Sequence, residues 1–196
     1  MEIFKLLSIT LGAILANNFI FSQFLGCCPF LGVSKKLDSS VGMSGAVIFV
    51  MFMATAVTFP IQIFILDQAG LSYLQTIVFI LVIAALVQFV EMFLKKLMPP
   101  LYNALGVYLP LITTNCAILG ATINAINYDY TFIQSIVYAL GAGVGYGLAM
   151  VLFAGVREEK LWDESGVPAA FKGVPMVLVS ATILSLSFMG FSGLFQ

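Results

Sequence analysis

Long apolar stretches alternate with short polar ones along the whole chain of 196 residues. Each stretch is at least as long as the roughly 20 residues that a helix needs to cross about 30 Å of hydrocarbon. Because a backbone in lipid must satisfy its own hydrogen bonds, we expect these stretches to be helical. The pattern predicts an all-α membrane protein, with one membrane domain over 1–196 and six spans at about 6–33, 41–66, 71–94, 101–124, 131–156 and 174–195.

The composition agrees with an integral membrane protein. Hydrophobic residues make up 61% of the chain and charged residues 9%, and the mean hydropathy is +1.10. A soluble domain of this composition would have no polar surface. The 8 basic and 9 acidic side chains form no basic patch. We therefore expect contact with membrane lipid and no nucleic-acid partner.

Basic residues occur mainly in every second loop. They follow the first, third and fifth apolar stretches, whereas the other two loops contain none, and Lys5 is the one exception. The positive-inside rule makes the basic loops cytoplasmic and puts both termini outside. The basic loop residues are Lys35, Lys36, Lys95, Lys96, Arg157, Lys160 and Lys172.

A short pattern that begins with cysteine occurs twice, 88 residues apart. CPFLGVS begins at Cys28 and CAILGAT begins at Cys116. Cys27, the third cysteine, has Asn115 as its repeat partner, so the duplication singles out Cys28 and Cys116. The patterns lie in the first and fourth stretches, which gives each repeat three crossings. An odd number of crossings reverses the second repeat, so we expect an inverted-topology repeat, with halves at about 1–95 and 96–196.

Both stretches that carry the pattern contain residues that interrupt helices. In straight helices Cys28 would lie about 10 Å from one face of the membrane and Cys116 about 12 Å from the other. A shared small site therefore requires both helices to be unwound or re-entrant. The interrupting residues are Asn17, Asn18, Gly26, Pro29 and Gly32 in the first stretch, and Gly106, Pro110, Thr113, Thr114, Asn115 and Gly120 in the fourth.

Two duplicated thiols in a chain without histidine favour a soft metal centre, with iron–sulfur chemistry first. A 2Fe–2S cluster needs about four protein ligands, so two would have to come from another chain. We expect an electron carrier completed by a homologous subunit or by a second copy. The alternative is a secondary transporter, which also uses inverted repeats and broken helices. A thiol–disulfide enzyme would want a C-x-x-C pair, whereas this chain has adjacent Cys27 and Cys28.

Over essentially its whole length the chain closely resembles the A subunit of the Rnf complex, the ion-translocating ferredoxin:NAD+ oxidoreductase of bacteria. It resembles less closely the matching E subunit of the Na+-translocating NADH:quinone reductase. The specific stretches are NNFIFSQFLGCCPFLGVSKKL at 17–37, FILVIAALVQFVEM at 79–92, LYNALGVYLPLITTNCAILG at 101–120, MVLFAGVRE at 150–158 and FMGFSGL at 188–194.

The resemblance implies a 2Fe–2S cluster in the inner membrane, shared with the homologous E subunit of opposite topology. The family's ligand positions fall on Cys28 and Cys116, and the position of Cys27 is usually aliphatic. Electrons would pass from ferredoxin through the B subunit to this cluster, then to flavins bound to the G and D subunits, and to NAD+ through the C subunit. Transport of Na+ or H+ would be coupled to that flow, and the sequence leaves the ion open.

Other polar and small residues in the spans have structural explanations. We expect Asn17, Asn18, Asn115 and Asn124 to cap broken helices, and the alternatives are that they donate to cluster sulfurs or line an ion path. The glycine-rich run at 141–147 looks like a nucleotide loop but lies inside a membrane span, so we expect it to allow close helix packing.

Overall fold

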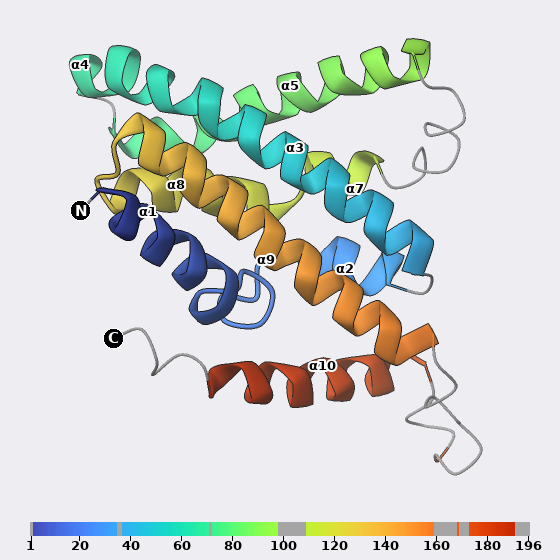
Figure 1. The fold of residues 1–196 in the computed structure, drawn as a ribbon. Coiled ribbons are helices and arrows are strands. Elements are labelled where there is room, and N and C mark those ends of the chain that lie inside the picture. Colours follow the sequence, from blue (N-terminus) through green and yellow to red (C-terminus); the bar gives the residue numbers. More distant parts are fainter. Residues whose placement is uncertain are drawn as a thin grey trace.

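The computed structural model describes residues 2–34, 37–70, 72–97, 109–158, 168 and 173–190 (Figure 1). These residues form helices and turns and no strand, in agreement with the all-α prediction. The helices are α1 (Glu2–Leu11), η1 (Gly12–Ala16), α2 (Cys27–Val33), α3 (Leu37–Ile61), η2 (Gln62–Leu66), α4 (Asp67–Ala69), η3 (Ser72–Leu74), α5 (Gln75–Leu97), α7 (Leu109–Thr113), α8 (Cys116–Asn127), α9 (Phe132–Glu158) and α10 (Val174–Met189). The elements η1 and η2 are π-helices, and η3 is a 3₁₀-helix.

Within the described residues, three continuous helices are long and apolar enough to cross a membrane: Leu37–Leu66, Gln75–Met92 and Phe132–Arg157. They correspond to the second, third and fifth predicted spans. The other predicted spans contain shorter apolar helices, at Leu6–Ala16, Leu111–Asn127 and Val174–Met189. Parts of the fourth and sixth predicted spans, at 101–108 and 191–195, lie outside the described residues.

The first apolar segment is interrupted, as its sequence predicts. Helix η1 ends at Ala16, ten residues of turns follow, and the helix resumes as α2 at Cys27. Asn18 stabilises this break. Its Nδ2 donates to the carbonyl of Gly145 in α9 (2.8 Å) and to that of Ile14 (3.3 Å), and its Oδ1 accepts from the backbone N–H of Ile20 (3.1 Å). Backbone groups freed by the break therefore find partners inside the protein, as a membrane interior requires.

The fourth segment is interrupted between α7 and α8. Helix α7 ends at Thr113, and α8 begins at Cys116 after a two-residue break. Asn115 is the N-cap of α8, and its Oδ1 accepts from the N–H of Ala117 at 3.1 Å. This confirms the predicted capping role of Asn115. Asn124 bonds the Oε1 of Gln23 at 3.2 Å through its Nδ2 and so links α8 to the break of the first segment.

Helix α9 is the centre of the bundle, with α3 on one side and α1 and η1 on the other (Figure 1). The glycine-rich run serves both contacts. A methyl group on Gly143 would lie 3.2 Å from Cα of Ile48 in α3, and one on Gly145 would lie 3.0 Å from Cα of Ile14 in η1. Small residues let the helix axes approach closely. The contacts confirm that the run allows close helix packing.

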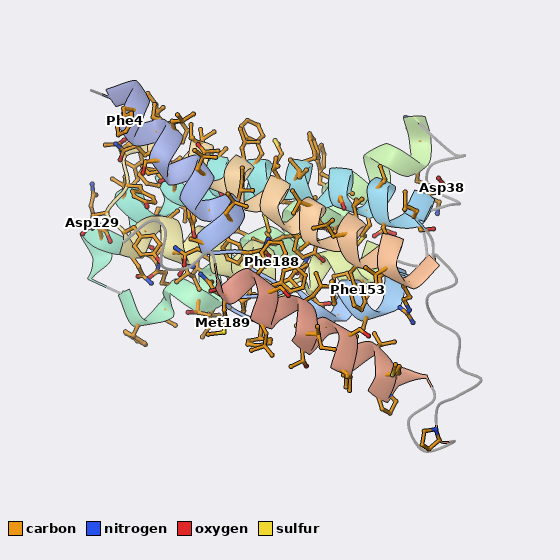
Figure 2. All side chains as sticks on the ribbon, turned by 60° about the horizontal axis from the view of Figure 1, so that its bottom comes forward. Phe4, Asp38, Asp129, Phe153, Phe188 and Met189 are labelled. Carbon is orange, nitrogen blue, oxygen red and sulfur yellow. The ribbon has the colours of Figure 1, made fainter. Side chains whose placement is uncertain are left out.

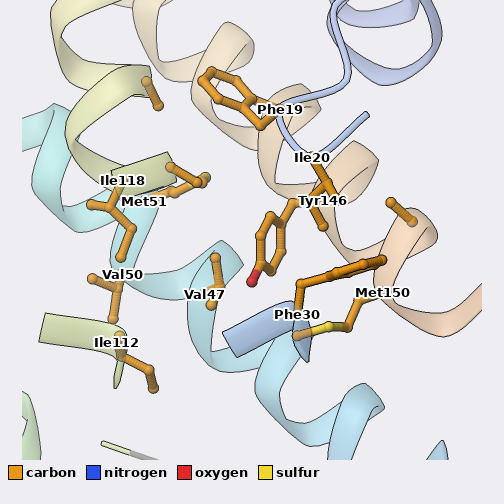
Figure 3. Close-up of a cluster of buried hydrophobic side chains, with 14 of the residues drawn as sticks. Phe19, Ile20, Phe30, Val47, Val50, Met51, Ile112, Ile118, Tyr146 and Met150 are labelled. Carbon is orange, nitrogen blue, oxygen red and sulfur yellow. The ribbon is translucent and has the colours of Figure 1, made fainter. Parts of the chain in front are cut away.

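Figure 3 shows the core formed around α9, where Tyr146 lies among Ile20, Phe30 and Val47. Apolar side chains from α3, α8 and both parts of the first segment complete this cluster. The α10 helix joins it through the break of the first segment. Ser185 donates to the carbonyl oxygen of Phe21 at 2.7 Å, and the ring of Phe188 lies 4.7 Å from that of Phe21.

The two ends of the bundle differ in charge. In Figure 1 the first turn of α3 and the last turns of α5 and α9 lie at the same end, on the right. Lys95 and Lys96 are in that last turn of α5, and Arg157 is in that of α9. The start of α1 and the end of α10 lie at the opposite end. The basic last turns of α5 and α9 therefore lie together at one end of the bundle.

Candidate functional site

Both predicted ligand residues lie where a half-helix begins. Cys28 is the second residue of α2, and Cys116 is the first residue of α8. Each comes directly after a break, and both side chains are exposed on the surface of this chain. The duplicated pattern therefore marks the same local structure twice, namely a helix that starts inside an apolar segment and presents a thiol in its first turn.

The tertiary structure brings the two breaks into direct contact at Gly26. A methyl group on Gly26 would lie 3.1 Å from Oδ1 of Asn115 and 3.1 Å from Cβ of Ala117. Gly26 lies two residues before Cys28, and Asn115 and Ala117 flank Cys116. A second contact supports the first, since a methyl group on Gly120 would lie 2.6 Å from Cδ1 of Leu25. The cysteine-bearing ends of α2 and α8 are therefore neighbours.

Cys27 lies close to the other two cysteines but differs from them in its surroundings. It is half-buried, and its Sγ donates to the carbonyl oxygen of Phe24 at 3.1 Å. The Sγ of Cys116 is 3.9 Å from the carbonyl oxygen of Thr114, which is a weak contact at most. Cys28 and Cys116 are thus the two thiols that face outward.

Two residues that the sequence did not single out hold α2 in place. Tyr146 is fully buried in α9, and its hydroxyl donates to the carbonyl oxygen of Gly26 at 3.4 Å. At the other end of α2, Nη1 of Arg157 donates to the carbonyl oxygen of Leu31 (3.2 Å) and to Oγ of Ser34 (2.9 Å). A cation at a helix C-terminus also interacts favourably with the helix dipole. The sequence marked Arg157 only as a loop charge.

Two thiols are suitable ligands for a soft metal, but they do not complete its coordination. Among the residues that the structure describes, no group of three or more His, Cys, Asp or Glu side chains could hold a metal ion. Two exposed thiols can supply half of the four ligands that an iron–sulfur cluster needs. Phe24, beside them in the break, is also exposed. The two thiols therefore lie on the surface of this chain, with an exposed apolar side chain nearby.

An all-helical chain with membrane-length apolar helices and two exposed thiols at helix breaks defines a class: a helical membrane protein whose interrupted helices present cysteines. The model of the Rnf-Nqr family, described as "Rnf-Nqr subunit, membrane protein", matches residues 6–195. The chain belongs to the Rnf-Nqr family.

Curated relatives match over nearly the full length of this chain. The A subunit of the Na(+)-translocating ferredoxin:NAD(+) oxidoreductase complex of Acetobacterium woodii is 54% identical, over 96% of this chain and 97% of the relative. The A subunit of the ion-translocating oxidoreductase complex of Syntrophotalea carbinolica is 54% identical over 97% of both chains. The protein of the same name in Vibrio cholerae serotype O1 is 48% identical over 96% of both chains.

Proposed function

We propose that this chain is the A subunit of an ion-translocating ferredoxin:NAD+ oxidoreductase in a bacterial inner membrane. In this proposal Cys28 and Cys116 hold half of an intramembrane 2Fe–2S cluster. The protein passes electrons from the ferredoxin-side iron–sulfur subunit to the flavin subunits, and that flow is coupled to transport of Na+ or H+. The observation that carries the proposal is the contact of Gly26 with Asn115 and Ala117, which makes the cysteine-bearing ends of two interrupted helices neighbours, each with an exposed thiol.

The residues of this chain have separate roles in such a site. Thiolates of Cys28 and Cys116 bind iron, for which sulfur is a suitable soft ligand. Asn115 fixes the start of α8, while Tyr146 and Arg157 hold the two ends of the segment that includes α2. A 2Fe–2S cluster bound here would supply one-electron transfer.

The packing of α3 against α9 supports an inverted repeat. Gly143 contacts Ile48, and Gly147 contacts Ser44, so the two helices run antiparallel. Extending this register brings Met51 and Phe52 opposite Ala139 and Leu140, which lie 88 residues further along the chain. The helices thus cross at positions that are equivalent in the two repeats. A pseudo-two-fold axis that relates two inverted repeats requires such a crossing. Six crossings, in halves at about 1–95 and 96–196, follow from the same repeat.

The remaining ligands would come from a partner. An ionised thiolate facing lipid would be costly, so the exposed cysteines favour a site that another protein chain covers. A homologous E subunit of opposite topology would supply two further cysteines and a matching apolar surface. The B, C, D and G subunits would carry the rest of the electron path, including the flavins.

The relatives' names favour a redox role over the transporter alternative, because both the A. woodii and S. carbinolica proteins are named as parts of oxidoreductase complexes. A secondary transporter would also need a substrate-binding group at the breaks. The side chains at the breaks include three thiols, several amides and a buried tyrosine, and neither break, at 17–26 or at 114–115, contains a charged residue.

The proposal is tested by replacing one cysteine at a time in the purified complex. Cys28→Ser or Cys116→Ser should remove the intramembrane 2Fe–2S signal in low-temperature EPR, because a hydroxyl is a poor ligand for iron. Cys27→Ser is the matched control and should keep the signal. If the signal is unchanged in both the Cys28 and the Cys116 variant, the assignment is wrong.

A second experiment tests the shared site. This protein expressed alone should contain almost no iron, whereas co-expression with its homologous partner should give about two irons per pair. About two irons per isolated monomer would exclude a shared cluster. About two per homodimer would replace the partner with a second copy.

A further inference from the structure

An open cavity of about 180 Å³ lies beside η2, which continues α3, and beside the C-terminal end of α8. Two acidic side chains line it. They are Asp67, directly after η2, and Asp129, in the turn after α8. Figure 2 shows Asp129 at the end of the bundle opposite Asp38, which is in the first turn of α3. By the loop charges this is the outer end of the protein.

Gln62, one of the residues that line the cavity, has a buried side-chain oxygen without a partner in the described part of the chain. It lines the cavity, is only 5% exposed, and lies in the π-helix η2 that follows Pro60. Its Nε2 donates to Oδ1 of Asp67 at 2.8 Å, which fixes the orientation of the amide. Its Oε1 is buried and has no hydrogen-bond partner among the described residues. A buried acceptor of this kind requires an explanation, and a water or an ion is the usual one.

Asp129 occupies a position where glycine is the ordinary choice. Helix α8 ends in a Schellman motif, in which Asp129 N–H donates to Ile126 O (2.9 Å) and Tyr130 N–H donates to Ala125 O (3.4 Å). Asp129 has φ +51° and is therefore left-handed, a conformation that glycine adopts most readily and that aspartate and asparagine tolerate better than other residues. Glycine at this position would therefore keep the turn while it removes the carboxylate.

The electrostatics of the cavity favour a cation. The C-terminal end of α8, at Ile126, has the negative end of a helix dipole. Burial and the neighbouring Tyr128 raise the pKa of Tyr130, so its hydroxyl stays protonated and adds no charge. The lining residues that the structure describes include two carboxylates and no basic side chain.

A second cavity, of about 440 Å³, shares Tyr130 with the first. It is lined by Asn17 and Ser22, which lie in the break of the first segment, the same break that ends at Cys27 and Cys28. The acidic cavity therefore opens next to a polar space that reaches the interrupted helix of the cysteine site.

We propose that the cavity between Gln62, Asp67 and Asp129 binds Na+ at the outer end of an ion path. Oxygen atoms are the preferred ligands of hard cations. A metal ion binds several oxygens at once, whereas a proton needs only one base, so a group of oxygens favours the metal ion. The proposal rests on the proposed function, because a component of an ion-translocating complex is where such a path is needed. It adds a site and an ion to that function.

The test measures equilibrium binding of radioactive Na+ to the purified complex. Asp67→Asn and Asp129→Gly should each weaken binding at one saturable site by about tenfold or more, the effect of losing one charged ligand. Asp129→Gly is the sharper variant because glycine suits the left-handed turn, so the fold is kept while the carboxylate is lost. Asp38→Asn, the same change at the other end of α3, should bind Na+ as the wild type does.

Iron content and the EPR signal, which test the proposed function, should be unchanged in all three variants. If Asp67→Asn and Asp129→Gly bind Na+ as tightly as the wild type, the cation site is wrong while the proposed function stands. Saturable binding of Ca2+ in place of Na+, lost in the same two variants, would also overturn the assignment to the ion path.

Discussion

The hydroxyl of Tyr146 donates to the carbonyl oxygen of Gly26 at 3.4 Å, and its Cε2 would lie 2.7 Å from a methyl group placed on that glycine. This one side chain of α9 both bonds and closely packs against the residue from which α2 begins. The position of Cys28, two residues later, therefore depends on a contact between residues 120 positions apart.

Gly26→Ala should destabilise the protein and reduce its iron content. The φ of Gly26 is +83°, which costs an alanine roughly 1–2 kcal/mol, and the added methyl group would overpack against Tyr146. Thermal unfolding and iron content of the complex provide the measurements. Gly32→Ala is the control, because its methyl group would meet no atom within 4 Å. Equal stability of the two variants would contradict this account.

Asn115→Ala should weaken the start of α8 by about 1 kcal/mol, the usual cost of losing an N-cap. Asn115→Ser should retain most of that stability, since serine caps equally well. The two variants would be compared by thermal unfolding and by the EPR signal. A serine variant as unstable as the alanine variant would show that packing against Gly26, and not capping, is what Asn115 provides.

Arg157→Gln should loosen the C-terminal end of α2. The guanidinium donates to Leu31 O and Ser34 Oγ, and hydrogen bonds from a charged group contribute about 1.5–3 kcal/mol in general. Faster amide hydrogen exchange within 27–34 is the expected signature. Lys96→Gln, a change of charge in the last turn of α5, serves as control and should leave exchange in that segment unaltered.

The topology can be tested with reporters. A reporter fused after Gln196 should be outside the cytoplasm and one inserted at Asp163 inside, because the basic residues follow the first, third and fifth apolar stretches. Activity of a periplasm-dependent reporter and of a cytoplasm-dependent one at each position gives the measurement. A cytoplasmic C-terminus would refute the proposed orientation and, with it, the outer location of Asp67 and Asp129.

Much of the local structure was predictable from the sequence. The three long helices follow from uninterrupted apolar runs, and the breaks before Cys28 and Cys116 follow from glycine, asparagine and the residues around them. In the fourth stretch the break falls at Thr114 and Asn115, two of the six residues that the sequence named as interruptions. Pro110, another of the six, lies in α7 and does not end that helix. Proline fits the first turn of a helix, where its missing N–H has no partner to lose.

The sequence by itself determined the candidate ligand residues, since the internal duplication selects Cys28 and Cys116 without any knowledge of the fold. Only the tertiary structure decided that their helix ends meet, that Tyr146 and Arg157 hold α2, and that Gln62 shares a cavity with Asp129. Apolar periodicity is a property of neighbouring residues, so it can be read along the chain. Contacts such as Tyr146 with Gly26 depend on how helices far apart in sequence pack together, and no local pattern specifies that packing.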